Sequence, residues 1–294
     1  MQTKNMFKRV AAAAGSAVLL GSLAVTTAGT ATAAPDAACT MALRSINSAG
    51  DAVIIGAWGT KPPTSVNTPD RHLYPAGEAK IASRFNWGPD VNGSSTTGYV
   101  VLGSTLYASR YGYLEDRDEE FNDLTKIADG WDKFTMVEES VVGARVAHYG
   151  LRNDGVLFRW TNGWKTVASA SGFANVKALA LISQTATYDT FLATTKTGVL
   201  ETIHIPTTAP LKPVVKTVRG STWQGFETLV AGKCGTGTLL TAIDKDTNAA
   251  YVYSIGHATG TTTPITNLGK FATPFGDPVY SRSTSDDDLP LTGE

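Results

Sequence analysis

Five β-hairpins recur along the chain at a nearly constant spacing, and this repeat strongly limits the folds that the chain can adopt. In each hairpin a turn rich in Asn, Asp or Gly separates two runs of β-branched and aromatic residues. The five hairpins cover residues 43–58, 99–108, 145–160, 190–205 and 238–255. Their returning strands begin at residues 52, 105, 156, 199 and 250, so the repeat is roughly 50 residues long.

A second element follows each hairpin after a loop of variable length. Its best copy is Ile-Ala-Asp-Gly-Trp-Asp-Lys-Phe at 127–134, and the others lie at 80–85, 167–173, 218–226 and 265–271. The strands at 135–139, 177–182 and 228–233 would each open the next unit. Five all-β units of about 50 residues are what a propeller with four-stranded blades requires. We therefore predict an all-β chain folded as a five-bladed β-propeller.

The first unit has no strand on its N-terminal side, and the segment Pro278–Ser281 near the other end of the chain can supply it. The ring of blades would then be closed by a C-terminal strand. A two-domain β-sandwich is the competing architecture, because it accounts for the strands equally well. It does not account for the constant spacing, so the propeller is favoured.

The first 33 residues have the three parts of a secretory signal peptide. Lys4, Lys8 and Arg9 form a basic region, residues 10–28 are apolar or small, and Ala31-Thr32-Ala33 offers a cleavage site. We therefore divide the chain into a signal peptide at 1–33, a propeller domain at 34–283 and a polar tail at 284–294. The protein is predicted to be secreted, with no attachment to a membrane after processing.

The balance of basic and acidic residues limits the classes of partner that the protein is expected to bind. Removal of residues 1–33 leaves 22 basic against 26 acidic residues, and four of the acids lie in the tail, so residues 34–283 are balanced at 22 against 22. Nucleic acid needs a basic stripe to neutralise phosphates, and an anionic lipid surface needs a basic patch. A neutral body favours an uncharged partner. We expect a monomer that uses no cofactor.

The chain has two cysteines, Cys39 and Cys234. In an exported protein two cysteines predict one disulfide, and the alternative is two free thiols. On the propeller map Cys39 lies at the start of blade one and Cys234 lies in blade five. The bond would therefore join the two ends of the ring.

Three segments resemble the repeat of the tachylectin-2-like five-bladed propeller lectins. They are Gly-Val-Leu-Phe-Arg-Trp at 155–160, its counterpart Ser-Thr-Leu-Tyr-Ala-Ser at 104–109, and the element at 127–134. The resemblance spans about residues 41–283. It implies a lectin that binds N-acetylated sugars, of the N-acetylglucosamine or N-acetylgalactosamine type, in clefts between blades.

The residues give an independent reason to expect sugar binding. A neutral sugar is held by an aromatic ring under its C–H face and by a few planar polar groups that orient its hydroxyls. The candidate residues are Trp131, Asp132, Trp160, Asn162, Trp164, Trp223 and Gln224. Trp131 and Trp223 are favoured because they occupy equivalent places beside glycine-containing loops. The alternative is that these tryptophans pack between blades.

No pattern in the sequence predicts catalysis. The four histidines are far apart without metal-ligand spacing, and no nucleophile elbow or phosphate loop is present. We interpret the Asp244-x-Asp246-x-Asn248 run as a hairpin turn rather than a calcium loop. The acidic run at 115–120 is interpreted as a solvated loop. A secreted glycoside hydrolase, which would need paired carboxylates, is kept as the alternative to a lectin.

Leu289-Pro290-Leu291-Thr292-Gly293 matches the Leu-Pro-x-Thr-Gly motif that sortases cleave to attach proteins to a Gram-positive cell wall. A polar spacer, residues 281–288, precedes it. No apolar helix and basic tail follow it in the sequence, so we expect a released protein. A wall-displayed adhesion module is the third hypothesis for its function.

Overall fold

The computed structural model describes residues 39–294, and the regular secondary structure of this part of the chain is almost entirely β-strand. Its one helical element is the short 3-10 turn η1 (Trp131–Lys133). Within residues 39–294 no helix is long and apolar enough to span a membrane. The predicted all-β class is confirmed. The predicted signal peptide and its cleavage site lie outside the described residues.

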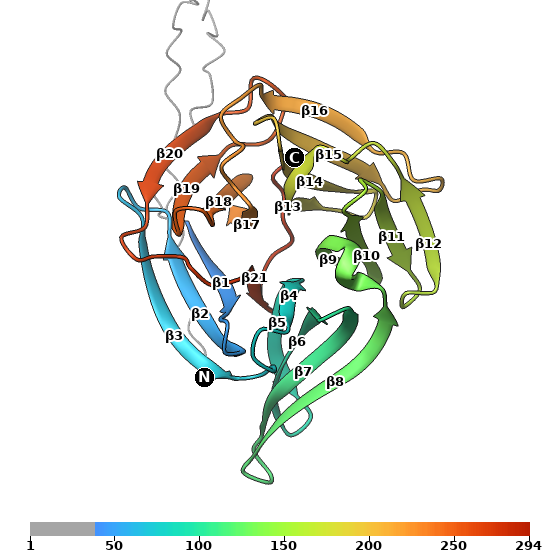
Figure 1. The fold of residues 1–294 in the computed structure, drawn as a ribbon, viewed down its shortest axis with the longest axis vertical. Helices are drawn as coiled ribbons and strands as arrows, with labels where there is room; N and C mark the ends of the chain where they lie inside the picture. Colours follow the sequence, from blue (N-terminus) through green and yellow to red (C-terminus); the bar gives the residue numbers. More distant parts are fainter. Residues whose placement is uncertain (1–38) are drawn as a thin grey trace, which may run out of the picture. The chain divides into compact units, whose positions relative to one another are not determined.

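Three of the sheets have four antiparallel strands each and follow one another along the chain. In Figure 1 the sheets surround a common centre in a propeller-like arrangement, with β4, β9, β13, β17 and β21 nearest to that centre. The strands of the three sheets are β9 (Phe134–Val142), β10 (Arg145–Arg152), β11 (Leu157–Thr161) and β12 (Thr166–Ala170); β13 (Val176–Gln184), β14 (Tyr188–Thr195), β15 (Leu200–Pro206) and β16 (Val214–Arg219); and β17 (Thr228–Cys234), β18 (Gly237–Asp244), β19 (Ala249–Ile255) and β20 (Ile265–Lys270).

The remaining nine strands form one sheet in the order β3-β2-β1-β21-β5-β6-β7-β8, with β4 paired to β6. The strands are β1 (Thr40–Ile46), β2 (Asp51–Trp58), β3 (Thr64–His72), β4 (Ala79–Ala82), β5 (Phe85–Asp90), β6 (Gly93–Leu102), β7 (Thr105–Leu114), β8 (Glu119–Asp129) and β21 (Val279–Ser285).

The strand β21 comes from the far end of the chain and joins the first two predicted units. It pairs antiparallel with β1, where Leu43 faces Arg282. Its last residues then pair parallel with β5, where Ser283 faces Phe85. The sequence had predicted these units as separate four-stranded sheets. They share one sheet because β21 is long enough to reach the edge of β5 with residues 283–285.

All five hairpins predicted from the repeat are observed as antiparallel pairs: β1–β2, β6–β7, β10–β11, β14–β15 and β18–β19. Glycine is required at the turn into β11, because Gly155 has φ 83° and a Cβ there would lie 2.1 Å from the Ala174 nitrogen. Residues 80–85, the first copy of the second recurring element, differ from the best copy in their pairing. Residues 79–82 form β4, which pairs with β6 of the second unit, whereas 126–129 form the end of β8.

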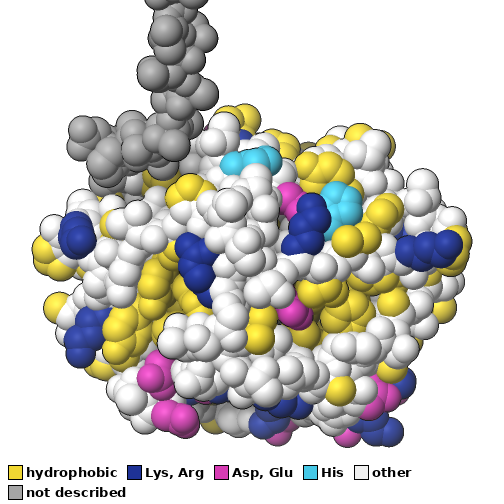
Figure 2. Space-filling view, turned by 90° about the horizontal axis from the view of Figure 1, so that it is seen from above, with side chains coloured by type: hydrophobic (Ala, Val, Ile, Leu, Met, Phe, Trp, Pro, Cys, Tyr) yellow, Lys and Arg dark blue, Asp and Glu magenta, His cyan; other side chains and the backbone are white. Residues whose placement is uncertain are grey.

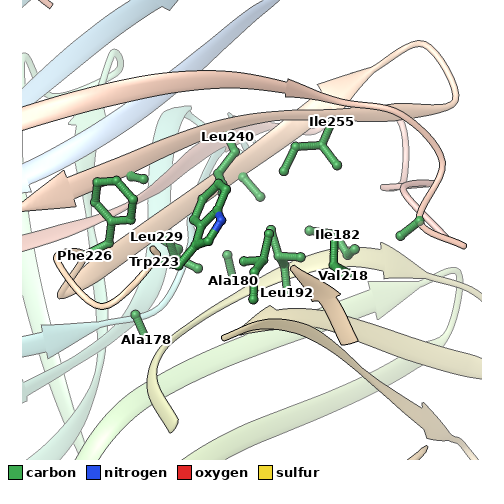
Figure 3. Packing of buried hydrophobic residues seen from close by; sticks show 14 residues of the cluster. Ala178, Ala180, Ile182, Leu192, Val218, Trp223, Phe226, Leu229, Leu240 and Ile255 are labelled. Carbon is green, nitrogen blue, oxygen red and sulfur yellow. The ribbon is translucent and has the colours of Figure 1, made fainter. Parts of the chain in front are cut away.

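Apolar side chains from facing sheets fill the spaces between them. Figure 3 shows one such cluster, in which Leu192 of β14 and Leu240 of β18 lie between the β13–β16 and β17–β20 sheets. Both side chains are fully buried. Removing these apolar surfaces from water is the main favourable contribution to this packing.

The predicted disulfide between Cys39 and Cys234 is present, with the two Cα atoms 5.4 Å apart. Cys39 directly precedes β1, and Cys234 is the last residue of β17. The bond therefore links the nine-stranded sheet to the last four-stranded sheet.

The sequence predicted a polar tail from residue 284 onward. In the structure β21 continues to Ser285, and the final residues return to the body, where Thr292 forms a β-bridge with Ser183. In Figure 1 the C-terminal label lies beside β13, β14 and β15.

Candidate functional site

Trp131, the favoured sugar platform, lies in a packed aromatic cluster. It sits on η1 and is 4% exposed. Its ring stacks on Phe134 at a centroid distance of 4.2 Å, and the rings of Trp160 and Trp164 lie 5.5 and 5.8 Å away. The Trp131 indole is therefore buried in this cluster, with little of its surface open to solvent.

The same cluster holds the other predicted residues of this region. The Trp164 ring stacks on His148 at 4.1 Å with 4° between the planes, and Tyr99 meets His148 edge-on at 4.9 Å. Asp132 and Asn162 are exposed at the margin, and Asn162 Nδ2 donates a hydrogen bond to Thr166 Oγ1 at 3.3 Å. The structure thus brings Trp131, Trp160 and Trp164 together in the aromatic cluster, where their rings pack on one another.

Trp223 is likewise part of the core. Figure 3 shows its ring inside the cluster between the last two four-stranded sheets. It is 6% exposed, and its neighbours Tyr253 and Phe226 have ring centroids 4.8 and 5.5 Å away. Gln224 is exposed beside it. The packing interpretation therefore fits both Trp131 and Trp223.

The aromatic cluster also shapes the ionisation of His148. Burial lowers the pKa of His148 to about 4, and the positive charge of Arg84 acts in the same direction. Arg84 itself pairs with Glu139 at 2.8 Å, and Glu139 lies 3.8 Å from His148 Nδ1. Burial raises the pKa of Glu139. The imidazole is consequently neutral at physiological pH and serves as a flat partner for the Trp164 ring.

This neutral histidine makes stability depend on pH. An unfolded chain binds a proton at His148 as the pH falls through about 6.5, whereas the folded chain does so only near 4. The contribution of His148 to stability is therefore fully present above pH 7 and is lost as the pH falls between these two values. We expect the free energy of unfolding in urea to fall by about 1–2 kcal/mol from pH 7.5 to 5.5, and the His148→Gln variant to lack this component. An unchanged pH profile in that variant would contradict the assignment.

A cleft that the sequence did not predict lies in the nine-stranded sheet, between the part formed by β1–β3 and the part formed by β5–β7. Its volume is about 320 Å³. Trp87 on β5 stands at this cleft with half of its surface (50%) exposed. The remaining lining residues are Arg44, Ile54, Asp70, Arg71, Ser94, Ser95, Thr96, Tyr111, Gly112 and Ser283.

The position of Trp87 follows from the alternation of side chains along β5. Phe85 and Trp87 are two residues apart, so they share one face of the strand. Phe85 is fully buried, with the guanidinium of Arg44 lying 5.3 Å from its ring centroid. Trp87 comes next on the same face and reaches solvent, held by backbone pairing to Thr96 and Ser285. Its indole is therefore presented by a strand that is fixed on both edges.

A carboxylate at the centre of the cleft is held by three neighbours. Asp70 Oδ2 accepts hydrogen bonds from Arg44 Nη1 at 2.7 Å and from the Tyr111 hydroxyl at 3.1 Å, and Asp70 Oδ1 lies 3.5 Å from Arg71 Nε. Arg44 is 3% exposed, so the Arg44–Asp70 pair is largely shielded from solvent. Burial raises the pKa of Tyr111, which keeps its hydroxyl protonated as a donor.

Arg71 is more exposed to solvent than Arg44, and its guanidinium is held in place by further contacts. Its Nη1 donates to the Gly112 carbonyl at 3.0 Å, and its guanidinium lies 5.4 Å from the Tyr111 ring centroid. The carboxylate of Glu120 on β8 is 3.7 Å from Arg71 Nη2. Together these contacts fix a planar guanidinium and a carboxylate beside an exposed indole.

Trp87 is not among the residues predicted from the recurring element, because it lies two residues beyond the first copy at 80–85. The sequence does contain one signal for Trp87. Phe85 and Trp87 alternate as they would on one face of a strand, and Gly88 follows directly. A Cβ on Gly88 would lie 2.2 Å from an Asp286 carboxylate oxygen, so the strand and the segment after β21 approach closely here. That contact joins residues 198 apart and has no local signature.

Asp70 is the one carboxylate among the residues that line this cleft, and Glu120 lies 3.7 Å from Arg71 Nη2 beside it. The acidic run 115–120 lies at the β7–β8 turn, at the tip of the long hairpin at the bottom of Figure 1. In the described part of the chain, no group of three or more His, Cys, Asp or Glu side chains is arranged to hold a metal ion.

No known family model and no curated protein matches the chain. Solved structures share a low similarity with it, among them the following two. One is the SapL1 lectin in complex with alpha methyl fucoside, with 10% identity, coverage of 78% of this chain and 80% of that chain, and a TM-score of 0.41. The other is the hydrazine synthase of Kuenenia stuttgartiensis, with 10% identity, coverage of 72% and 75%, and a TM-score of 0.37. Likeness at this level does not determine a function.

Proposed function

We propose that this protein is a lectin-like, carbohydrate-binding protein that holds a glycan in the Trp87 cleft. The observation that carries the proposal is the half-exposed Trp87 indole beside the fixed Arg71–Asp70–Arg44 group. A pyranose needs an aromatic face for its C–H groups and planar polar groups for its hydroxyls. This cleft supplies both in a rigid arrangement.

Its size also suits a small glycan. A volume of about 320 Å³ lies at the lower end of the range for small-molecule sites, roughly 300–1,000 Å³. The hydroxyls of Ser94, Ser95 and Thr96 line one wall and can exchange hydrogen bonds with sugar hydroxyls. The resemblance noted in the sequence favours an N-acetylated sugar as the ligand.

The architecture that we propose around this site is a five-bladed propeller whose first blade is completed by β21. The pairing of β21 with β1 and the disulfide between Cys39 and Cys234 both support it. We also propose that the protein acts outside the cell as a monomer. The leader-like first 33 residues and the disulfide support export.

Binding without hydrolysis is the activity that the cleft supports. Glycosidases place two carboxyl groups about 5–9.5 Å apart across the scissile bond, and Asp70 has no second carboxylate opposite it among the lining residues. Asp70 is also engaged by Arg44 and Tyr111. The equal numbers of basic and acidic residues in 34–283 also favour an uncharged ligand. In the face shown in Figure 2, acidic and basic side chains lie scattered among uncharged ones.

A glycan array that includes N-acetylglucosamine and N-acetylgalactosamine ligands tests the proposal directly. We expect binding to a small set of glycans, with no release of reducing ends on prolonged incubation. An array without any bound glycan would overturn the lectin proposal, and released reducing ends would establish the glycosidase alternative instead.

A further inference from the structure

The segment that matches the wall-sorting motif is docked on the folded body. Gln184 N of β13 donates to the Leu291 carbonyl at 3.1 Å, and Gly293 N donates to the Ile182 carbonyl at 2.8 Å. These two hydrogen bonds flank the Ser183–Thr292 bridge, so residues 291–293 run along β13 as a short added strand. The segment thus continues the sheet that contains β13.

Contacts from the last sheet hold the other side of this segment. Ala258 N donates to the Gly293 carbonyl at 2.7 Å. Lys233 Nζ on β17 donates to the Pro290 carbonyl and to Thr292 Oγ1, each at 3.0 Å. Gly293 therefore has both its N–H and its carbonyl bonded to the body, from opposite sides of a groove between β13 and β17.

Leu291, Gly293 and Glu294 each make their own contacts in this groove. Leu291 is 1% exposed and belongs to the buried cluster that includes Phe191 and Ile203. A Cβ at Gly293 would lie 2.4 Å from Thr238 Oγ1 and 2.9 Å from the Ile182 carbonyl, so only glycine fits there. The Glu294 carboxylate accepts a hydrogen bond from the Thr190 hydroxyl and lies 2.7 Å from His204 Nδ1.

The first two residues of the motif, Leu289 and Pro290, are exposed to solvent, unlike the residues that follow them. Leu289 is 69% exposed, and the Pro290 side chain is exposed as well. The groove therefore accounts for Leu291, Thr292, Gly293 and Glu294 by their shape and hydrogen bonding. It does not require Leu289-Pro290, which are the residues that make the segment a sorting motif.

We propose that this groove is a docking site for the chain's own segment 291–294, and that docking withholds the Thr292–Gly293 bond from a sorting transpeptidase. Such an enzyme attacks the Thr292 carbonyl carbon with its thiolate, expels the Gly293 amine, and passes the acyl group to the amine of a glycine peptide. To do so it must enclose the segment in its own cleft. Because Leu291 is buried and Gly293 is bonded on both sides, the segment must first leave the groove.

The test uses the full chain, a transpeptidase that cleaves Leu-Pro-x-Thr-Gly, and a fluorescent triglycine peptide as acceptor. In a matched control, a flexible Gly/Ser spacer and a second Leu-Pro-Leu-Thr-Gly copy follow Glu294. We expect the native chain to be labelled about 100-fold more slowly than the control, because the rate then depends on the rare undocked state. Equal rates for the two chains would overturn the proposal.

A substitution within the motif provides a second comparison. Leu291 occupies the variable position of the motif, so Leu291→Asp leaves the recognised residues intact while placing a charge in an apolar site. We expect labelling of this variant to rise towards the rate of the appended copy. If Leu291→Asp remains as slow as the native chain while the appended copy is labelled rapidly, docking through Leu291 is disproved. The comparison of native chain and appended copy stands even if this variant is poorly folded.

Discussion

Replacement of Trp87 by alanine is expected to weaken glycan binding by about 30- to 150-fold while leaving the fold intact. The half-exposed indole is the largest apolar surface that the cleft offers to a sugar. Loss of roughly 100 Å² of apolar contact costs about 2–3 kcal/mol, and each 1.4 kcal/mol is a factor of ten in affinity. Calorimetric titration with the best glycan from the array measures this change directly.

Two further variants test whether the loss of affinity is due to the Trp87 indole itself. Trp87→Phe keeps an aromatic face and should retain more affinity than Trp87→Ala. Val167→Ala removes an exposed apolar side chain on β12, outside the cleft, and should bind as the native protein does. If Trp87→Ala binds every glycan with native affinity, the ligand does not rest on this indole and the assigned cleft is wrong.

Replacement of Trp223 by alanine is expected to have the opposite pattern, with a large loss of stability and no specific loss of binding. The ring is buried among the side chains shown in Figure 3, so its removal leaves a cavity between two sheets. Substitutions of this kind cost about 3–5 kcal/mol of unfolding free energy. Urea denaturation of Trp223→Ala beside Trp87→Ala gives the comparison, and the latter should lie within about 0.5 kcal/mol of the native protein.

This pair of variants separates the two interpretations of tryptophan that the sequence left open. A Trp223→Ala protein with native stability and impaired glycan binding would restore Trp223 as a sugar platform. Native binding in a destabilised but folded Trp223→Ala protein would assign the ring to the core.

The repeat made much of the fold predictable, because hairpins are local. Turn residues such as Gly155 and the flanking β-branched residues lie within a few positions of each other, and all five hairpins were placed correctly. The disulfide was predictable for a different reason, since two cysteines in an oxidising compartment allow one intramolecular pairing. Neither the hairpins nor the disulfide required knowledge of how distant strands are arranged in space.

The candidate site was not predictable in the same way. Trp87, Arg44 and Asp70 come from three strands, and their meeting depends on how the first two parts of the nine-stranded sheet are joined. The sequence identifies an indole but not its exposure, which is why buried Trp131 and Trp223 were chosen and Trp87 was overlooked. Exposure is decided by neighbours that are distant in sequence.

The joining of β1 to β21 has a consequence for how the protein folds. Leu43 and Arg282 are partners in adjacent strands, so the first sheet lacks a member until nearly the whole chain is available. Pairings of such high sequence separation form slowly, because loop closure precedes any gain from contact. The nascent chain therefore stays incompletely folded during most of its synthesis. For the export that we propose, this delay would let the chain cross a membrane as an extended polypeptide and complete its first sheet afterwards.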